Sequence, residues 1–346
     1  MSKKAASGRG AAAAMAVAAA AALAACRTPA SDGPGATQGW SDPARAAWYN
    51  ADQGSRLMPL LWFQALEQPS ATGKFLDAAY LANFRILPPW PGQTLPIGFA
   101  VDRIDDDTRL AKTSLHWRGT PAAGDKVDWV GLNCAACHTG QMSYGGKAIT
   151  VDGAPSLFDF QSFIEAVDAA LTQTRDAAQP GAADAGRWDR FASAVLAAPG
   201  GGGDTPDNRK RLLGELEKLI AWETATEALN KTSSRYGYGR VDAVGHIYNR
   251  ILLFGGAPQP TPNPADAPVS YPHLWNITKQ SQLQWDGIAQ NSKINIGVTP
   301  TDFGALGRNT GEVLGVFGEV VIRKPSGPGD LAGFVSSARV NTLNEL

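Results

Sequence analysis

The chain has 346 residues, and its 31 lysines and arginines nearly balance its 32 aspartates and glutamates. This balance, without a basic patch, argues against a nucleic-acid partner. Only 18% of the residues are charged, whereas 38 glycines, 23 prolines and 10 tryptophans are present. Such a composition predicts many loops, with aromatic side chains packed around a cofactor rather than a regular sheet.

The first 25 residues predict a secretory signal peptide. A short cationic stretch precedes an alanine-rich run from Ala11 to Ala25, which is too short and too weakly apolar for the roughly 20 residues of a membrane span. Cys26 follows Leu-Ala-Ala, as in the bacterial lipobox, so we expect it to carry lipid; an ordinary signal peptide with an incidental cysteine is the alternative. Two or more acyl chains would anchor the protein stably.

Residues 26–42 are rich in Pro, Gly and small polar residues and predict a flexible tether. From the signal peptide and this tether, we expect the protein to lie on the periplasmic side of a bacterial membrane or on the cell surface. The partner expected from these features is the membrane, reached through the lipid anchor.

Helical patterns then predict a mostly α, loop-rich fold. Asp42 as N-cap and Pro43 at the first helical position open an amphipathic stretch that runs to Leu66. Four further helices are expected over residues 73–87, 157–171, 187–196 and 207–230. Alternating charges in the last of them indicate a solvated face. Residues 257–268 predict an extended loop, and residues 313–322 either a strand pair or packed irregular loops.

The most specific motif is Cys134-Ala-Ala-Cys137-His138, the attachment signature of c-type haem. Two thiols one helical turn apart can add to the two vinyl groups of the porphyrin, and the adjacent histidine can supply an axial nitrogen to the iron. A thioredoxin-like pair would need a β-α-β context, and a structural zinc site would need a second pair of ligands. We therefore predict one covalent haem c, bound by Cys134 and Cys137, with His138 as the proximal iron ligand.

The ligand opposite His138 stays open at this stage. The candidates are His116, His246, His273, Met58 and Met142. Met142 is too close to His138 in sequence to reach the far face. A sixth position filled by water or O₂ is an equal alternative to His273, and its occupant decides between electron transfer and gas chemistry.

His246 lies in a helical segment over residues 240–253. The apolar stripe expected there consists of Val241, Val244, Tyr248, Ile251 and Leu252. Because His246 falls on the other side of that stripe, we expect it to face solvent or a haem propionate rather than the iron.

Around the motif the chain resembles the dihaem c-type cytochromes related to rubber oxygenases and, more distantly, to bacterial dihaem cytochrome c peroxidases. The segments that carry this resemblance span most of the chain in order: 131–140, 152–156, 239–242, 269–275, 284–287 and 304–312. The resemblance implies a cytochrome-c-like haem core near residues 125–170 with large irregular additions, within one single-haem region over residues 43–346.

Members of that family carry a second C-x-x-C-H motif in a C-terminal domain, and this sequence has none. The alternatives are a truncated gene product, or a separate redox partner or cytochrome that supplies the second haem. In the rubber oxygenases the N-terminal haem is the one that meets oxygen, so the resemblance implies a haem oxidoreductase acting on O₂ or peroxide. A membrane-tethered electron carrier with a closed, six-coordinate haem is the second hypothesis, and a haem-bearing scaffold without turnover is the third.

Three further side chains are candidates for this site. Arg308 suits a haem propionate, since a guanidinium can pair with a carboxylate through two hydrogen bonds. Trp275 and Trp285 are candidates for a pocket wall or an electron path, with core packing as the alternative for each. The glycine-rich stretch 304–311 does not match a dinucleotide-binding fingerprint.

Overall fold

The computed structural model describes residues 38–103, 110, 117, 127–255, 263–284, 286–296, 299–322, 326–328 and 334–345. These described residues fall into two compact units: residue 38 with residues 141–151, and those of residues 39–140 and 152–346. The predicted signal peptide, Cys26, His116 and Trp285 lie outside the described residues. In the part that is described, none of the helices combines the length and apolar character needed to cross a membrane.

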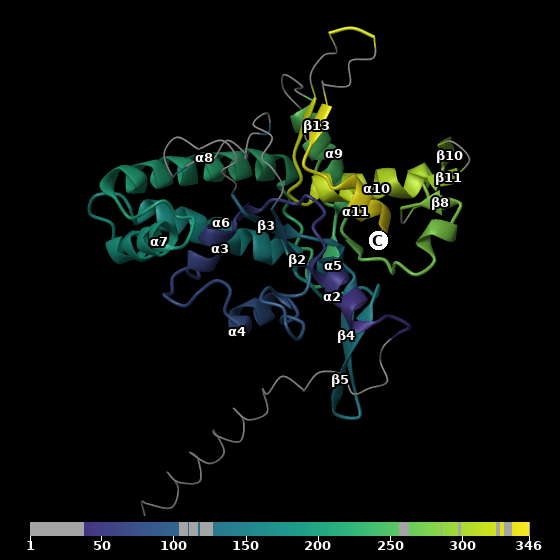
Figure 1. Cartoon of the computed structure of the whole chain (residues 1–346), viewed down its shortest axis with the longest axis horizontal. Helices are drawn as coiled ribbons and strands as arrows, with labels where there is room; N and C mark the ends of the chain where they lie inside the picture. Colours follow the sequence, from purple (N-terminus) through teal and green to yellow (C-terminus); the bar gives the residue numbers. More distant parts are fainter. Residues whose placement is uncertain are drawn as a thin grey trace, which may run out of the picture. The chain divides into compact units, whose positions relative to one another are not determined.

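Helices dominate the second unit (Figure 1), so the predicted mostly α, loop-rich class is confirmed. The α-helices are α2 (Asp42–Asn50), α3 (Leu60–Ala65), α4 (Ala78–Leu81), α5 (Cys134–Cys137), α6 (Phe160–Asp176), α7 (Ala185–Ala197), α8 (Pro206–Asn230), α9 (Ala243–Phe254), α10 (Phe303–Gly315) and α11 (Val340–Glu345). The described residues also form the 3₁₀ helices η1 (Ala82–Phe84), directly after α4, and η3 (Ile277–Lys279), between β7 and β8. Helix α6 packs against α7 and α8, and α9 packs against α8 and α10.

The strands are short and form small antiparallel groups. The three-stranded sheet has the order β1-β3-β2, with β1 (Met58–Pro59), β2 (Phe99–Asp102) and β3 (Trp129–Leu132). The paired strands are β4 (Thr139–Tyr144) with β5 (Lys147–Asp152), β6 (Arg240–Val241) with β7 (Val269–Ser270), β8 (Gln282–Leu283) with β9 (Ala289–Gln290), β10 (Lys293–Ile296) with β11 (Thr299–Asp302), and β12 (Val320–Ile322) with β13 (Phe334–Ser336). All four residues of β3 are buried, and the strand leads through Asn133 into α5.

An aromatic cluster forms much of the core of the second unit. The Phe63 and Phe99 rings stack at 5.6 Å, and the Phe99 and Phe163 rings meet edge to face at 5.8 Å. Phe163 comes from α6 and also contacts Phe75 and Phe84. Because Phe63, Phe99 and Phe163 are fully buried, truncating one to alanine would cost about 3–5 kcal/mol of stability.

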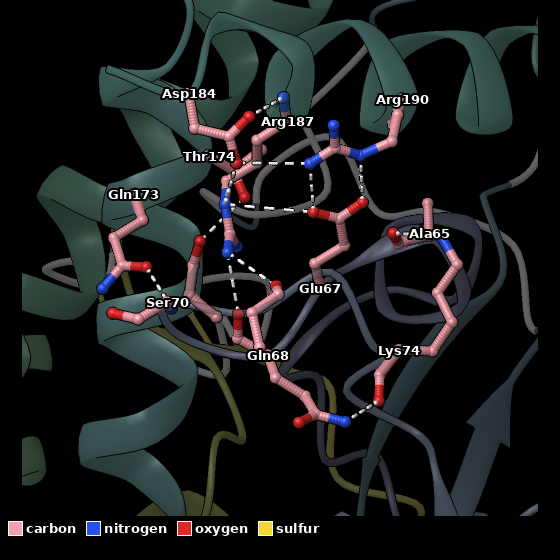
Figure 2. A network of polar contacts seen from close by, with 12 residues as sticks. Ala65, Glu67, Gln68, Ser70, Lys74, Gln173, Thr174, Asp184, Arg187 and Arg190 are labelled. Carbon is pink, nitrogen blue, oxygen red and sulfur yellow. Dashed lines mark hydrogen bonds and ion pairs between the residues drawn. The ribbon is translucent and has the colours of Figure 1, made fainter. Parts of the chain in front are cut away.

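A buried polar network ties the turn after α3 to α7 (Figure 2). The Arg190 guanidinium donates two hydrogen bonds to Glu67, at 2.7 and 2.9 Å. Arg187, which is buried whereas Arg190 is exposed, donates through Nη2 to the carbonyl oxygens of Gln68 and Ala71, both at 2.9 Å. Buried Glu67 therefore has charged partners, which offsets the cost of removing its carboxylate from water.

The predicted continuous helix from Asp42 to Leu66 is wrong. Helix α2 ends at Asn50 and α3 begins at Leu60, with a loop between them. In that loop Gly54 has a φ of +88°, and a Cβ there would lie 1.9 Å from the Ser337 carbonyl oxygen, so glycine is required. The N-cap is Ser41, whose hydroxyl accepts from the Ala44 amide, rather than Asp42. The helix expected over 73–87 is reduced to α4 and η1.

The loop around Gly54 is held by residues from the far end of the sequence. The Ser337 hydroxyl donates to the Gly54 carbonyl oxygen across 283 residues of chain. The Arg339 amide donates to the Gln53 carbonyl oxygen, and its guanidinium binds Asp52 and buried Asp102. These contacts fix the segment that carries the Gln53 side chain.

Helix α10 replaces the irregular structure expected before residue 316. Four glycines (Gly304, Gly307, Gly311 and Gly315) lower its intrinsic helix propensity. Two of them meet α9, where a Cβ on Gly315 would lie 2.8 Å from Ile247 Cγ1. Close packing between α9 and α10 therefore outweighs the local preference, and the strand pair β12–β13 begins only after this helix.

Candidate functional site

The C-x-x-C-H motif forms a single helical turn that is fixed by Asn133. The Asn133 side chain caps α5 by accepting from the Ala135 amide at 3.0 Å. Its Nδ2 faces the carbonyl oxygens of Trp48, Tyr49 and Ala51, at 3.3, 3.3 and 3.0 Å. The end of α2 therefore holds the turn, and the predicted one-turn separation of the two thiols is present.

Gln53 anchors the first cysteine. Its Oε1 accepts from the Cys134 amide at 3.0 Å and from the Cys134 thiol at 3.2 Å. Both Cys134 and Cys137 are free thiols and are half-buried. They are therefore available for a covalent bond to another group.

His138 follows the turn with one ring nitrogen already engaged. Its Nδ1 lies 2.8 Å from the Pro272 carbonyl oxygen. A carbonyl only accepts, so Nδ1 carries the proton and the lone pair stays on Nε2. Burial lowers the pKa of His138 to about 4, against the opposing effect of the Pro272 bond, so the ring is neutral at pH 7. A neutral histidine oriented by a backbone carbonyl is the usual form of a metal-ligating histidine.

The thiols differ from those of a redox pair. Burial raises the pKa of Cys134 to about 11 and that of Cys137 to about 12. Reactive redox cysteines depend instead on a lowered pKa and a thiolate at neutral pH. The motif also lies between β3 and β4, which do not pair with each other. Attachment of a group to both sulfurs fits these thiols better than disulfide exchange.

Among the described residues, no group of three or more His, Cys, Asp and Glu side chains is arranged to hold a metal ion. A haem needs no such group, because the porphyrin supplies four nitrogens and the protein adds only axial ligands. The described cavity of about 410 Å³ lies elsewhere, beside Arg187 at the ends of α6 and α7, and none of the motif residues lines it.

Helix α10 brings two charges to the motif. The charge of Glu312 raises the pKa of both thiols, and that of Arg308 acts on Cys134 and His138. Burial raises the pKa of Glu312, against the opposing effects of Arg308 and of a hydrogen bond from Gln284. Burial likewise lowers the pKa of Arg308. Arg308, predicted as a propionate partner, is thus placed beside the motif, where that role stays a prediction.

Glu312 and Gln284 were not predicted as site residues. Glu312 is four residues from Arg308, which puts both on one side of a helix. The sequence does not announce that helix, because four glycines lie among residues 304–315. Gln284 has no distinguishing signal in the sequence outside the segments that carry the family resemblance.

Tyr271 is a further residue that sequence reasoning missed. Its side chain is 4% exposed, and its hydroxyl donates to the Phe158 carbonyl oxygen at 3.0 Å. It also makes a hydrogen bond with the Cys137 thiol, and its ring centroid lies 6.3 Å from that of His138. Tyr271 therefore supports the second cysteine and the histidine together.

The sixth-ligand candidates are dispersed. His273 is exposed and packs against Trp275, with ring centroids 5.6 Å apart. Met58 is fully buried in β1, and Met142 is 57% exposed on β4. His273 follows Pro272 directly, on the segment that binds Nδ1 of His138, and its role as a distal ligand stays a prediction.

His246 was predicted to face solvent or a haem propionate because the apolar side of its helix was expected to be the buried side. His246 is only 6% exposed, and Phe160 and Tyr236 surround its ring. The expected apolar stripe is turned outward, with Tyr248 at 54% and Ile251 at 41% exposure. Helix α9 instead buries Asn249 and Arg250, because α8 supplies partners for their polar groups.

Comparison with known proteins gives one distant relative. No protein-family model matches the chain, and no solved structure matches it. A protein of Sinorhizobium fredii, described as uncharacterized protein y4iJ, is 34% identical over 323 residues, or 89% of this chain. The match covers 48% of that relative, so the chain spans about half its length. The relative's description assigns no chemistry to the shared region.

Proposed function

We propose that the protein is a c-type cytochrome that carries one covalent haem and acts as an oxidoreductase on O₂ or peroxide. The observation that carries the proposal is the state of His138, whose Nδ1 is bound to the Pro272 carbonyl at 2.8 Å beside two free thiols one helical turn apart. α5 and its supports would form a cytochrome-c-like core within residues 125–170. The export signal and lipid-bearing Cys26 belong to the same proposal.

The residues present fit a haem. Cys134 and Cys137 would hold it through thioether bonds, and Nε2 of His138 would face the iron. The haem supplies one-electron redox chemistry and, where one axial position is open, a binding place for O₂ or peroxide. Arg308 would pair with an acidic group of the porphyrin.

The α10 side chains suit proton chemistry at an open position. Burial raises the pKa of the Glu312 carboxyl, so it can hold a proton closer to neutral pH than an exposed glutamate can. With a haem bound, this carboxyl would be the proton-holding group beside the motif and would serve as a general acid. Gln284 acts on the same carboxyl and lowers its pKa, against the effect of burial.

An electron carrier with a closed iron is the alternative, with His273 as the second ligand. Two features argue for the open site: His273 is exposed, and its segment lies at the Nδ1 edge of His138 rather than at Nε2. The buried carboxyl of Glu312 also has no proton-transfer role in a carrier whose iron is closed by protein on both sides.

The test is to express the chain with the cytochrome c maturation machinery and stain a denaturing gel for haem. Wild type and Cys26→Ala are expected to retain the stain, whereas the double variant Cys134→Ala, Cys137→Ala should lose it. Unstained wild-type protein would overturn the proposal. Spectra of the reduced protein with and without CO then separate the two functions: a large CO shift supports the open site, and an unchanged low-spin spectrum supports the carrier.

A further inference from the structure

An exposed tryptophan is held rigidly beside the motif. Trp275 is 50% exposed, yet its indole Nε1 donates to the Asp152 carbonyl oxygen at 2.9 Å. Gly153 lies flat against the ring, since a Cβ at that position would be 2.9 Å from Nε1. The Asp152 side chain is itself fixed by hydrogen bonds from Arg45 and Tyr49. A large apolar ring that stays outside the core but is locked in place is typical of a contact surface.

Two short routes join this tryptophan to His138. One runs from the His138 ring through Nδ1 to the Pro272 carbonyl oxygen, three residues before Trp275. The other runs along the backbone: the Gly153 amide donates to the His138 carbonyl at 2.8 Å, and the Leu274 amide donates to the Gly153 carbonyl at 2.9 Å. The exposed His273 ring packs on Trp275 along the first route.

More exposed apolar side chains come from segments bonded to this one. Leu157 is 60% exposed and Tyr238 is 51% exposed. A Cβ on Gly239, next to Tyr238, would lie 3.6 Å from Leu157 Cδ2. The Tyr271 amide donates to the Gly239 carbonyl oxygen at 3.1 Å, which ties these segments to Pro272 and Trp275. We call Leu157, Tyr238, His273 and Trp275 the aromatic patch.

The exposed charges on these segments are positive, and the adjoining Asp152, Asp159 and Asp242 are buried or half-buried and hydrogen-bonded. Arg85, whose guanidinium lies 5.1 Å from the centre of the Tyr238 ring, is exposed, as are Arg240 and Lys279. The four segments that form and flank the patch, residues 82–86, 153–158, 237–241 and 270–279, contain no aspartate or glutamate. A surface of this charge favours an acidic partner and steers it by long-range attraction.

We propose that the aromatic patch is the docking surface of an acidic electron-transfer protein, which reduces the haem through the Trp275–Pro272–His138 connection. This inference rests on the proposed haem function. In the step, the partner's reduced centre loses one electron and the iron goes from ferric to ferrous, with no bond made or broken. Apolar contact at the centre and cations around it match the general form of a transient protein interface.

The test uses haem-loaded protein and a reduced plant-type ferredoxin as an acidic one-electron donor, with haem reduction followed by stopped flow. The triple variant Arg85→Glu, Arg240→Glu, Lys279→Glu is expected to slow reduction about tenfold or more at low salt. The matched control is Lys210→Glu, Arg211→Glu, Lys231→Glu, which makes the same change in net charge at exposed positions on α8 and at its C-cap. Trp275→Leu probes the aromatic contact itself.

Wild-type reduction should slow as salt is added, and both patch variants should be slower than the control while dithionite reduces all four proteins at similar rates. Equal rates for the patch and control variants, or a wild-type rate that does not fall with salt, would overturn the docking proposal. Because every protein is first checked for covalent haem by gel staining, that failure is distinct from failure of the proposed function.

Discussion

Two neutral histidines occupy contrasting regions of the second unit. His138 follows the α5 turn, has Nδ1 bound to a backbone carbonyl and is half-buried. His246 lies on α9, is 6% exposed and meets aromatic rings and the Tyr236 hydroxyl. Burial lowers the pKa of both, so burial and neutrality alone do not mark a ligand. What distinguishes His138 is a fixed acceptor on one nitrogen, with two thiols beside it.

Replacing each histidine with alanine should give the largest difference between the two regions. His138→Ala should reduce covalent haem content about tenfold or more, because the ligand and its oriented ring are lost. His246→Ala should keep haem but destabilise the fold by about 2–4 kcal/mol through the cavity it leaves. Haem staining and denaturant unfolding measure the two effects. If both variants lose haem alike, the two regions are not functionally distinct.

His246 should contribute to the pH dependence of stability, together with His138, whose pKa is lowered in the same way, and Asp168, whose raised pKa acts in the opposite sense. The pKa of His246 in the folded state is about 3 against 6.5 for an unperturbed histidine, so the unfolded state binds the proton first as pH falls. The His246 contribution to stability is therefore complete above pH 6.5 and decreases below it, by roughly 3 kcal/mol at pH 4 at 1.36 kcal/mol per pH unit. Urea unfolding from pH 7 to 4 measures the slope. His246→Gln should flatten it, and an equally steep variant would contradict this assignment.

The support of the α5 turn can be tested at Asn133. Asn133→Ala removes the cap of α5 and the side-chain contacts to the end of α2, and should cost about 2–3 kcal/mol of unfolding free energy. Asn133→Asp keeps the acceptor for the Ala135 amide but loses the donors. Because the aspartate would also turn a carboxylate oxygen toward three backbone carbonyl oxygens, it is expected to be no more stable than the alanine variant. An alanine variant as stable as the wild type would show that the cap contributes little. The environment of Tyr236, whose ring contacts His246, should be unaffected.

The smallest effect is expected at Tyr271. Tyr271→Phe removes the hydroxyl that binds the Phe158 carbonyl and the Cys137 thiol, at a cost of about 1 kcal/mol. Exposed Tyr238→Phe is the matched control and should change stability by less than about 0.5 kcal/mol. In haem-loaded protein, Tyr271→Phe should also shift the reduction potential, whereas Tyr238→Phe should not. Equal reduction potentials in the two variants would show that the Tyr271 hydroxyl does not influence the site.

The strongest sequence predictions concern residues whose local pattern and packing agree. The Cys134–His138 turn and helices α6, α7 and α8 are all present because their capping residues and apolar spacing match the fold. Sequence reasoning failed where tertiary packing reverses a local preference. Helix α9 buries polar residues because α8 satisfies them, and α10 forms despite four glycines because α9 needs close approach.

Site geometry was predictable only for the motif itself. Pro272, Tyr271, Gln53 and Glu312 reach it from segments far apart in sequence, and a single sequence gives no sign of such pairings. The Pro272 carbonyl is a backbone group, so no residue type announces it. The same limit applies to the loop around Gly54. The need for glycine there comes from the close approach of the Ser337 carbonyl oxygen, not from residues near Gly54 in the sequence.

The contact between Gly54 and Ser337 also bears on the order of assembly. It joins residues 283 positions apart, and contacts of such separation form late because a long loop has to be closed first. Until residues 337–339 arrive, the segment that brings Gln53 to Cys134 lacks its outer support. The first cysteine would thus remain accessible until late in folding, and the proposed attachment of haem would then precede closure of the loop.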